Sequence, residues 1–236
     1  MLSCLCLKQG EVPYLNRNRK VSDFWRDVVN PNGLSYLWDI PVKPVVSKVM
    51  AVALGVKKMT VHEFRNLEFA ENDRHWYELL DGELVKKKAP TPAHQRVARK
   101  LTLALDAFIS QNNLGELFFA PVDVFLDDTN SPQPDLVFVA TANEAIVTDN
   151  GIEGVPQLVV EIISPTSVVR DRFTKKDLYE RFGVKEYWIV DPSNQEIEIY
   201  TLNNERYELL SAASVLEGEL KSAVPDDLVL DVKTLF

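Results

Sequence analysis

Two acidic residues and one lysine in this chain have positions that suit metal-assisted hydrolysis. The first, Glu161, interrupts the apolar run Leu158-Val159-Val160-Glu161-Ile162-Ile163. Burying an unpaired charge costs several kcal/mol, so such a carboxylate is normally paired, protonated or bound to a cation. The alternative is an edge-strand residue that points to solvent, because successive side chains on a strand face opposite ways.

The second acidic residue, Asp135, follows Gln133-Pro134 and opens the apolar run Leu136-Val137-Phe138-Val139, which places it at the mouth of a sheet. A Pro-Asp pair taken alone is more often a turn. Together with Glu161 it supplies two hard carboxylates at neighbouring strand ends, an oxygen shell that accepts Mg²⁺ or Mn²⁺ and leaves positions for phosphate and water. The pair predicts a metal site with Asp135 and Glu161 as ligands.

The lysine, Lys175, shares one face of a predicted helix with Asp171 and Tyr179, four residues to either side. This helix directly follows the strand that carries Glu161. A catalytic Lys175 would orient or deprotonate the attacking water, or neutralise charge in the transition state. A solvated lysine paired with Asp171 is the alternative. His94 lies toward the apolar face of an earlier helix, where a supporting and a catalytic histidine both fit.

The elements that would position these side chains follow from apolar periodicity and turn signals. In chain order they are a short capped helix near 60–64, a hairpin of strands 77–80 and 83–86, a helix from 91 closed by 112–115, strands 116–120, 122–126, 135–140 and 158–163, a helix at 171–182, a strand at 186–190, and further hairpins. The strand, helix, strand unit at 158–190 implies a parallel pair. We therefore expect an α/β fold of mixed α+β type, with a mixed sheet flanked by helices and additional hairpins.

The first 58 residues differ in character from the rest. They show no sustained period, contain scattered prolines and aromatics, and are net basic. They form either an accessory extension or translated sequence upstream of a start at Met50 or Met59. We place the main domain at residues 59–236.

The cysteine content and the apolar runs indicate the cellular compartment. The only two cysteines, Cys4 and Cys6, have no partner spacing for a zinc site or a disulfide framework, which suits a reducing cytoplasm. Apolar runs stay well below the roughly 20 residues that a membrane span needs. We expect a cytoplasmic protein without a membrane partner.

The net charge of −9 argues at first against a nucleic-acid partner, because Lys and Arg normally drive binding to polyanions. Basic residues nevertheless gather in two short windows of the sequence, and a protein with a net negative charge can still have a local basic surface. The windows contain Lys86, Lys87, Lys88, Arg96, Arg99 and Lys100, and Arg170, Arg172, Lys175, Lys176, Arg181 and Lys185.

The order of these motifs resembles a known family. Pro134-Asp135, then Glu161 and a downstream lysine, resemble the PD-(D/E)XK restriction-endonuclease-like superfamily. The wider match is to the bacterial Uma-type endonuclease family and covers about residues 59–236. Its blocks are Tyr77-Glu78-Leu79-Leu80-Asp81-Gly82-Glu83, His94-Gln95-Arg96-Val97, Ala120-Pro121-Val122-Asp123-Val124, Gln133-Pro134-Asp135-Leu136, Val160-Glu161-Ile162-Ile163-Ser164-Pro165 and Glu186-Tyr187-Trp188-Ile189-Val190-Asp191.

The resemblance implies a restriction-endonuclease-like mixed sheet, Asp135 and Glu161 as metal ligands, and Glu83 as an auxiliary acid. The superfamily lysine stands two residues after the glutamate, where this chain has Ile163, so the role passes to Lys175 on the next helix. We expect support for this site from His94, Gln133, Asp171 and Tyr179, and contacts to DNA from Arg96, Arg99, Lys100, Arg170 and Arg172.

The resulting hypothesis is a Mg²⁺-dependent DNA endonuclease in which a metal- and Lys-activated water cleaves the phosphodiester bond. The acidic surface and the displaced lysine favour an alternative, a catalytically inactive nucleic-acid- or protein-binding module that keeps the fold. A small-molecule hydrolase with the same metal site is a third interpretation. The oligomeric state is open, with a homodimer among the alternatives.

Overall fold

The computed structural model describes residues 57–236 except Ala70, Arg74 and Glu217. Residues 57–236 are one of the two units into which the chain divides. The expected N-terminal extension, residues 1–58, lies outside the described residues apart from its last two. The alternative start at Met50 and the two cysteines lie outside them as well.

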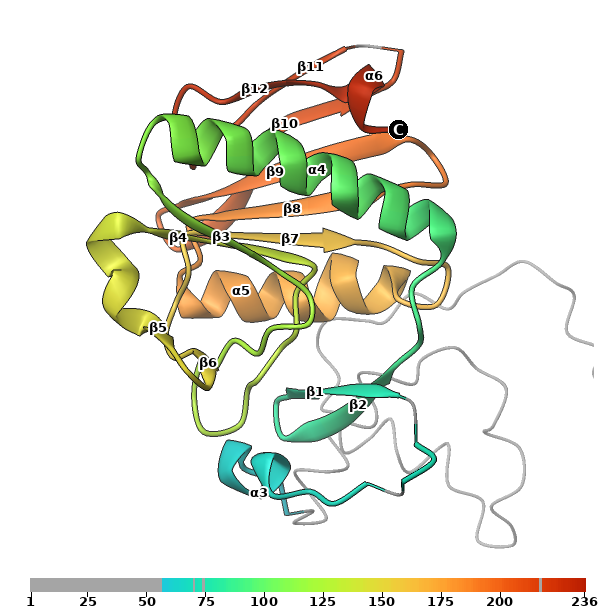
Figure 1. Ribbon diagram of the computed structural model, residues 1–236, viewed down its shortest axis with the longest axis vertical. Coiled ribbons are helices and arrows are strands. Elements are labelled where there is room, and N and C mark those ends of the chain that lie inside the picture. Colours follow the sequence, from blue (N-terminus) through green and yellow to red (C-terminus); the bar gives the residue numbers. More distant parts are fainter. Residues whose placement is uncertain (1–56, 70, 74, 217) are drawn as a thin grey trace, which may run out of the picture. The chain divides into compact units, whose positions relative to one another are not determined.

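A six-stranded mixed sheet forms the centre of this unit, in the strand order β10-β9-β8-β7-β4-β3 (Figure 1). The strands are β3 (Gly115–Phe119), β4 (Leu136–Ala140), β7 (Leu158–Ile162), β8 (Glu186–Asp191), β9 (Glu196–Asn203) and β10 (Arg206–Ser214). β7 and β8 run parallel, as the strand, helix, strand pattern predicted, and the other neighbouring pairs of this sheet are antiparallel. The predicted mixed sheet flanked by helices is confirmed.

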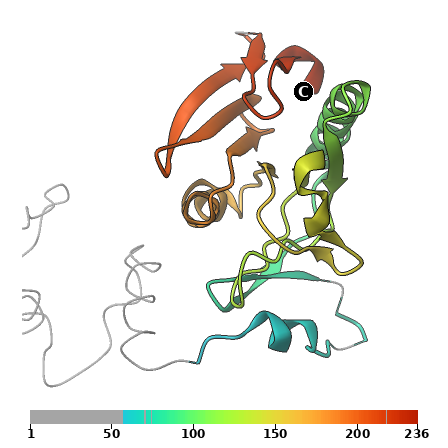
Figure 2. The same cartoon turned by 90° about the vertical axis from the view of Figure 1, so that its left-hand side faces the viewer.

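Helices cover the two faces of the sheet (Figures 1 and 2). α4 (Pro92–Gln111) crosses one face, and the π-helical segment η2 (Arg170–Lys175) continues into α5 (Lys176–Phe182) on the other. The Thr91 side chain caps α4 by accepting a hydrogen bond from the His94 backbone N–H, with Pro92 in the first turn. α5 ends at Gly183, whose φ of 81° is the left-handed conformation that glycine adopts without strain.

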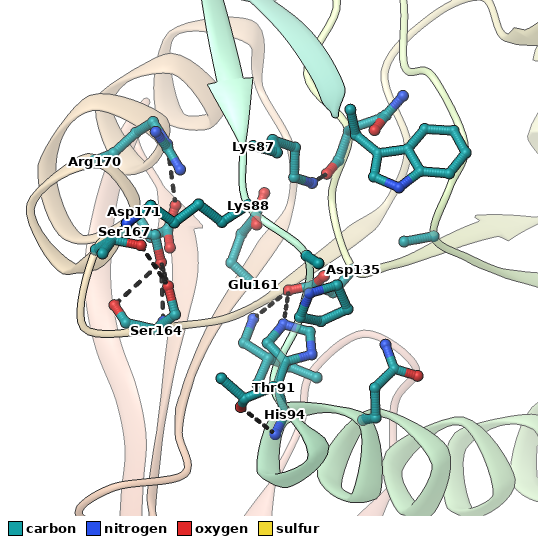
Figure 3. A pocket seen from close by; sticks show the side chains of 18 of the residues that line it. Lys87, Lys88, Thr91, His94, Asp135, Glu161, Ser164, Ser167, Arg170 and Asp171 are labelled. Carbon is teal, nitrogen blue, oxygen red and sulfur yellow. Dashed lines mark hydrogen bonds and ion pairs between the residues drawn. The ribbon is translucent and has the colours of Figure 1, made fainter. Parts of the chain in front are cut away.

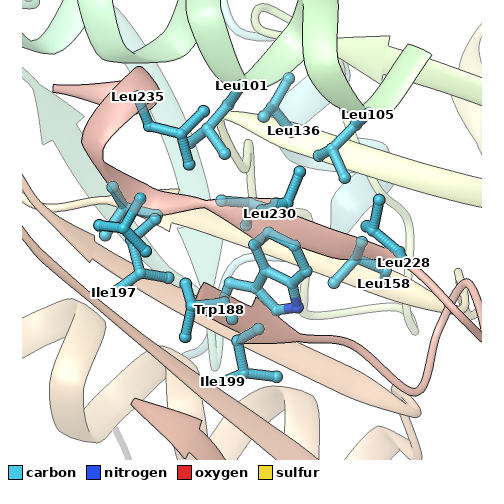
Figure 4. Packing of buried hydrophobic residues seen from close by; sticks show 14 of the residues in the cluster. Leu101, Leu105, Leu136, Leu158, Trp188, Ile197, Ile199, Leu228, Leu230 and Leu235 are labelled. Atoms are coloured by element: carbon cyan, nitrogen blue, oxygen red, sulfur yellow. The ribbon is translucent and has the colours of Figure 1, made fainter. Parts of the chain in front are cut away.

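The larger hydrophobic core lies between α4 and the sheet (Figure 4). α4 contributes an apolar stripe at helical spacing, and the strands contribute every second side chain. The fully or almost fully buried members that Figure 4 labels are Leu101, Leu105, Leu136, Leu158, Trp188, Ile197, Ile199, Leu228, Leu230 and Leu235. This core fixes the α4 face of β4, β7 and β8.

Alternation along β7 decides where Glu161 points. Leu158, Val160 and Ile162 belong to the core under α4, whereas Val159 and Ile163 belong to a second core with Tyr179. Glu161 lies two residues from both Val159 and Ile163, so its side chain is on the same face of β7 as theirs, which is the face covered by η2 and α5. The edge-strand alternative for Glu161 is therefore wrong, since β7 lies between β4 and β8 and Glu161 is 3% exposed.

The hairpin of β1 (Trp76–Leu80) and β2 (Glu83–Lys87) forms a separate two-stranded sheet, as predicted. Its turn residues Asp81 and Gly82 have φ of 49° and 75°, the positive values that a tight hairpin turn requires. Leu79 exchanges two backbone hydrogen bonds with Ser131, at 3.0 and 2.8 Å. These bonds fasten the hairpin to the loop that precedes β4.

The strand predicted at 122–126 is wrong. This segment makes only isolated bridge contacts, and its hydrogen bonds go to loop residues, from Val124 N–H to the Pro132 carbonyl and from Phe125 N–H to the Ile152 carbonyl. The physical reason is that β4 already has β3 and β7 on its two edges. The segment therefore cannot pair with β4, and these N–H groups bond to carbonyls outside the central sheet instead.

Short elements complete the described unit. They are α3 (Val61–Arg65), the 3₁₀ turn η1 (Thr141–Ile146), β5 (Val147–Thr148), β6 (Gly151–Ile152), β11 (Glu219–Lys221), β12 (Val229–Asp231) and α6 (Val232–Leu235). Thr60 and Glu63 form the capping box predicted at the start of α3. No helix in the described part of the chain has the combined length and hydropathy that a membrane crossing requires.

Candidate active site

The sheet brings Asp135 and Glu161 together. β4 and β7 pair antiparallel with Leu136 opposite Val160, so Asp135, just before β4, and Glu161, just after Val160, lie at the same end of this strand pair. The Asp135 backbone N–H donates to the Val160 carbonyl at 3.1 Å. The Asp135 side chain in turn accepts a hydrogen bond from the backbone N–H of Ile162, the residue after Glu161. Two acids 26 positions apart in sequence thus come to the same end of the sheet and line one pocket.

Asp135 is held as a carboxylate. Its Oδ2 accepts a hydrogen bond from the Ile162 backbone N–H at 2.7 Å and lies 3.2 Å from His94 Nε2. Burial alone would raise the pKa of Asp135, but the hydrogen bond and the charge of His94 hold it below its usual value. Burial would likewise lower the pKa of His94, and Asp135 raises it instead. His94 therefore supports Asp135 from the first turn of α4.

Glu161 is bonded to two donors from the helix above it. Its Oε1 accepts from Lys175 Nζ at 2.7 Å and from the Tyr179 hydroxyl at 2.9 Å. Burial raises the pKa of Glu161 to about 8, and the Lys175 charge only partly offsets this. Lys175 itself is 1% exposed, so the solvated-lysine alternative is wrong.

A third buried acid, Glu78, completes the cluster. Lys175 Nζ lies 2.8 Å from Glu78 Oε2, and Arg170 Nε lies 3.4 Å from Glu78 Oε1. Burial acts to raise the pKa of Glu78, but Lys175 and the other nearby cations hold it below its usual value. Lys175 therefore bridges a carboxylate of the hairpin and a carboxylate of the central sheet.

Glu83 does not join this cluster. It lies opposite Leu80 at the turn end of the hairpin, and its side chain is exposed. Glu78 has the buried position instead, because it stands in the middle of β1, opposite Val85. The structure therefore corrects the prediction that Glu83 is the auxiliary acid. The hairpin residue that contacts Lys175 is Glu78.

The signal for Glu78 was present in the sequence. Glu78 stands beside Leu79 and Leu80 in a strand-like run, as Glu161 stands in its own apolar run. Its partners Arg170 and Lys175 lie about a hundred positions away in sequence, so its pairing depends on tertiary structure. Periodicity within the hairpin could not show it.

The helix residues predicted to share a face with Lys175 lie around the site. Asp171 is 3% exposed, and its Oδ1 lies 3.9 Å from Arg170 Nε. Burial raises the pKa of Asp171, although Lys175 lowers it. η2 is π-helical from Arg170 to Lys175, a conformation often found at functional sites because it re-aims side chains within a helix.

Gln133 ties the hairpin to the strand that begins after Asp135. Its backbone N–H donates to Glu78 Oε2 at 3.3 Å, and its side-chain amide donates to Asp123 Oδ1 at 2.9 Å. Lys87 Nζ donates to the Gln133 carbonyl at 2.5 Å. Lys87, Glu78 and Asp123 were not among the predicted site residues, although Lys87 stands in the first basic window.

The predicted DNA-contacting residues divide into two groups. Arg170 lines the pocket described below, and Arg96 and Arg99 are exposed on α4. Arg172 and Lys100 are engaged within the protein: Arg172 pairs with Glu198 at 2.6 Å, and Lys100 donates to the Phe236 carbonyl at 2.5 Å. A window of like charge in the sequence does not show which members meet acids after folding.

A pocket of about 400 Å³ opens above the two acids (Figure 3). Asp135, Glu161 and Lys175 line it, together with His94 and Arg170. Its remaining walls come from the end of the hairpin, the start of α4, Ala120-Pro121, Gln133 and the Ser164–Ser167 segment. The side chains of Glu161 and Asp135 are 4% and 13% exposed, so both acids lie at the floor of the pocket.

The donor set fits a hard divalent cation with few protein ligands. No group of three or more His, Cys, Asp or Glu side chains arranged to hold a metal occurs among residues 57–236 where these are described. Two carboxylates remain, and the hydrogen bonds within the described residues engage Asp135 Oδ2 and Glu161 Oε1, not Oδ1 or Oε2. Mg²⁺ commonly takes one or two carboxylates and completes its shell with water and phosphate.

A solved structure shares this fold. It is described as "Crystal structure of a putative nuclease belonging to DUF820 from Anabaena variabilis ATCC 29413 at 1.96 A resolution". The TM-score is 0.59 and the sequences are 19% identical, over 75% of this chain and 97% of that one. At this identity the likeness shows the fold alone, a mixed sheet flanked by helices like that of a nuclease.

The sequence assigns the family. The profile of the Uma2 family, described as "Putative restriction endonuclease", matches residues 61–233, so the chain belongs to this family. The resemblance that the sequence motifs suggested is thereby confirmed. A search of curated proteins found no significant match.

Proposed function

We propose that this protein is a nuclease that hydrolyses phosphodiester bonds in DNA with the help of Mg²⁺ or Mn²⁺. The observation that carries the proposal is that Asp135 and Glu161, with Lys175 hydrogen-bonded to Glu161, line the floor of one pocket. The description of the Uma2 family supports the same reaction class.

Asp135 and Glu161 would hold the cation through the oxygens that face the pocket. A divalent ion bound there would polarise the phosphoryl group and lower the pKa of a bound water. Asp135 is prepared for this role because His94 and the Ile162 N–H keep it ionised and fix its orientation. Such preorganisation avoids a reorganisation cost when charge develops during the reaction.

Lys175 acts as a donor in this proposal. Its ammonium group donates toward two carboxylates and so presents no lone pair that could accept a proton. An ammonium in this position can donate to the attacking water or to a phosphoryl oxygen on which negative charge grows. Glu78 forms an ion pair with Lys175, and the Tyr179 hydroxyl donates a hydrogen bond to Glu161, so both contacts fix the Lys175–Glu161 pair in position.

The cations around the pocket would receive the DNA backbone. Arg170, Lys87 and Lys88 line the pocket, and Arg96 and Arg99 are exposed on the neighbouring helix α4. Phosphate contacts of this kind give affinity without sequence specificity. Arg172 and Lys100 are not included because they do not line the pocket and because Glu198 and the Phe236 carbonyl engage them elsewhere.

The test is a cleavage assay with the purified full chain and labelled DNA, carried out with Mg²⁺, with Mn²⁺ and with a chelator. We expect cleavage only with a metal and its loss in Asp135→Ala. Cleavage that survives both Asp135→Ala and Glu161→Ala would come from a contaminant and would refute the proposal.

The main alternative function is a binding module without turnover. It is favoured by Lys175, which two carboxylates already engage. In the same experiment this alternative predicts DNA binding, measured by fluorescence anisotropy, with no cleavage under any metal. That result would replace the nuclease proposal.

A further inference from the structure

Trp76 is an exposed aromatic side chain at the site, and the chemistry described above does not use it. It opens β1, lines the same pocket as Asp135 and Glu161, and is 52% exposed. Trp188, by contrast, is fully buried in the core. The half-exposed indole of Trp76 is therefore available to a ligand that enters the pocket.

The strand that carries Trp76 is fixed relative to the acids. Trp76 stands two residues before Glu78, so the two side chains lie on the same face of the hairpin. The contact of Glu78 with Lys175 anchors this face to the helix above Glu161. The indole is therefore positioned by the catalytic cluster and not by a free loop.

Cations accompany the indole. Lys87 is the direct cross-strand partner of Trp76 and also lines the pocket, and its Nζ is tied to the Gln133 carbonyl. Lys88 follows it, is exposed and lines the pocket as well, as Figure 3 shows. An aromatic platform next to lysines is the combination with which proteins bind single-stranded nucleic acid, where bases stack on the ring and phosphates meet the cations.

The depth of the acids restricts the form of the substrate. The Glu161 and Asp135 side chains are almost covered, at 4% and 13% exposure, beneath a pocket of about 400 Å³. A single strand can bring a phosphate to acids at this depth without carrying a complementary strand with it. In an unpaired strand the base next to that phosphate is also free to stack on an exposed aromatic ring such as that of Trp76.

We propose that Trp76 forms a base-stacking subsite that makes the site selective for an unpaired nucleotide, so that the preferred substrate is single-stranded or locally unpaired DNA. The statement about the preferred substrate rests on the proposed nuclease function. Its test rests only on binding.

The experiment measures the affinity of the full chain for a short end-labelled DNA strand and for the annealed duplex of the same sequence, in chelator, by fluorescence anisotropy. We expect the single strand to bind more tightly than the duplex. Stacking of one base is worth about 1–3 kcal/mol, so Trp76→Ala should weaken single-strand binding by about 5- to 150-fold and change duplex binding little.

Two further variants separate stacking from a folding defect. Trp76→Phe keeps an aromatic face and should recover part of the affinity that Trp76→Ala loses. Leu84→Ala removes another exposed apolar side chain of the same hairpin, one that does not line the pocket, and should bind like the wild type. The stability of each variant is checked by thermal unfolding.

Equal affinity of the wild type for single strand and duplex, or wild-type binding by Trp76→Ala, would overturn the inference. Because binding is measured without turnover, these outcomes leave the nuclease proposal standing. Selective Trp76-dependent binding of the single strand without any metal-dependent cleavage would have the opposite meaning: the subsite would stand and the nuclease proposal would fail.

Discussion

Two buried glutamates on the neighbouring parallel strands β7 and β8 have very different surroundings. Glu186 begins β8 and is fully buried on the α4 face, where Trp188 also packs. Glu161 lies near the carboxyl end of β7 on the opposite face. The carboxyl ends of parallel strands are the usual place for ligands in open sheets, and only Glu161 is at such an end.

The partners of Glu186 use up its hydrogen-bonding capacity. Its Oε1 accepts from Trp188 Nε1 and from the Ser222 hydroxyl, each at 2.6 Å, and its Oε2 accepts from the Ala223 and Val224 N–H groups at 2.8 and 3.2 Å. Burial raises the pKa of Glu186, and these donors oppose the shift. All four donors are neutral, so the group joins strand and loop and presents nothing to a ligand.

Glu161 differs in each respect. Its partners are a cation and a phenol, both on one oxygen, and it lines a pocket. The comparison shows that burial of an acid alone does not indicate function. What distinguishes Glu161, the acid proposed to function, is a charged partner, a second acid lining the same pocket and contact with that pocket.

The largest expected effect tests the functional side of this comparison. Glu161→Gln keeps the shape of the side chain but removes the charge that would hold the cation. We expect metal-dependent cleavage to fall by about 100- to 1,000-fold, the loss typical when one electrostatic group of an active site is removed. Initial cleavage rates at saturating metal measure it.

Folding stability should not follow the activity in this variant. An amide is cheaper to bury than a carboxylate, and Lys175 keeps its pair with Glu78. Urea unfolding should therefore give a free energy of unfolding close to that of the wild type. A collapse of stability in Glu161→Gln would show that the glutamate is structural and would erase the contrast with Glu186.

The second prediction tests the structural side. Glu186→Gln places an NH₂ group against donors that need an acceptor, at Trp188 and Ser222 or at Ala223 and Val224. We expect a loss of about 2–4 kcal/mol in the free energy of unfolding, because buried donors are left unsatisfied. Urea unfolding measures the loss.

The same variant should cleave DNA at the wild-type rate at a temperature where it is folded. Glu219→Gln, on the exposed face of β11, is the matched control and should change stability by no more than about 0.5 kcal/mol. Unchanged stability in Glu186→Gln would mean that its four donors find other partners.

The third prediction concerns Glu78, which stands between these two extremes. It is fully buried like Glu186, but it pairs with Lys175 like Glu161. Glu78→Gln leaves Lys175 one charged partner in place of two. We expect kcat to fall by about 10-fold, or about 1.4 kcal/mol in the barrier, with KM for DNA unchanged.

A double-mutant cycle with Lys175→Met assigns the loss. If Glu78 acts through Lys175, the two substitutions together should reduce kcat no further than Lys175→Met alone. Additive losses would instead give Glu78 a role of its own in the reaction.

How far the sequence predicts this site depends on the kind of signal. A carboxylate inside an apolar run needs only local information, and it identified Glu161. The joint use of Asp135 and Glu161 could be proposed because strand mouths in one sheet meet, although the structure was needed to show that both acids line one pocket. The central sheet was predictable for the same reason, since buried strands have strong local patterns.

Contacts between residues that are distant in sequence limited what could be predicted of the site. The sequence does not show that Arg172 meets Glu198, that Glu78 meets Lys175, or that the helix after β7 adopts a π turn. The 122–126 segment is β-like in composition, but strand formation also needs a free neighbouring edge, which composition does not report. The Arg172 and Glu78 misses concern partners that are distant in sequence.

The smallest expected effect belongs to Glu83 and decides between two acids of one hairpin. Glu83 and Glu78 lie on the same face of the hairpin, but Glu83 is exposed at the turn end, opposite Leu80. Glu83→Gln makes the same chemical change as Glu78→Gln and should alter kcat by less than about 2-fold and stability by less than about 0.5 kcal/mol. The cleavage and unfolding assays used for Glu78→Gln check both values. A large loss of kcat in Glu83→Gln with Glu78→Gln unaffected would restore Glu83 as the auxiliary acid and would mean that the hairpin turns when DNA binds.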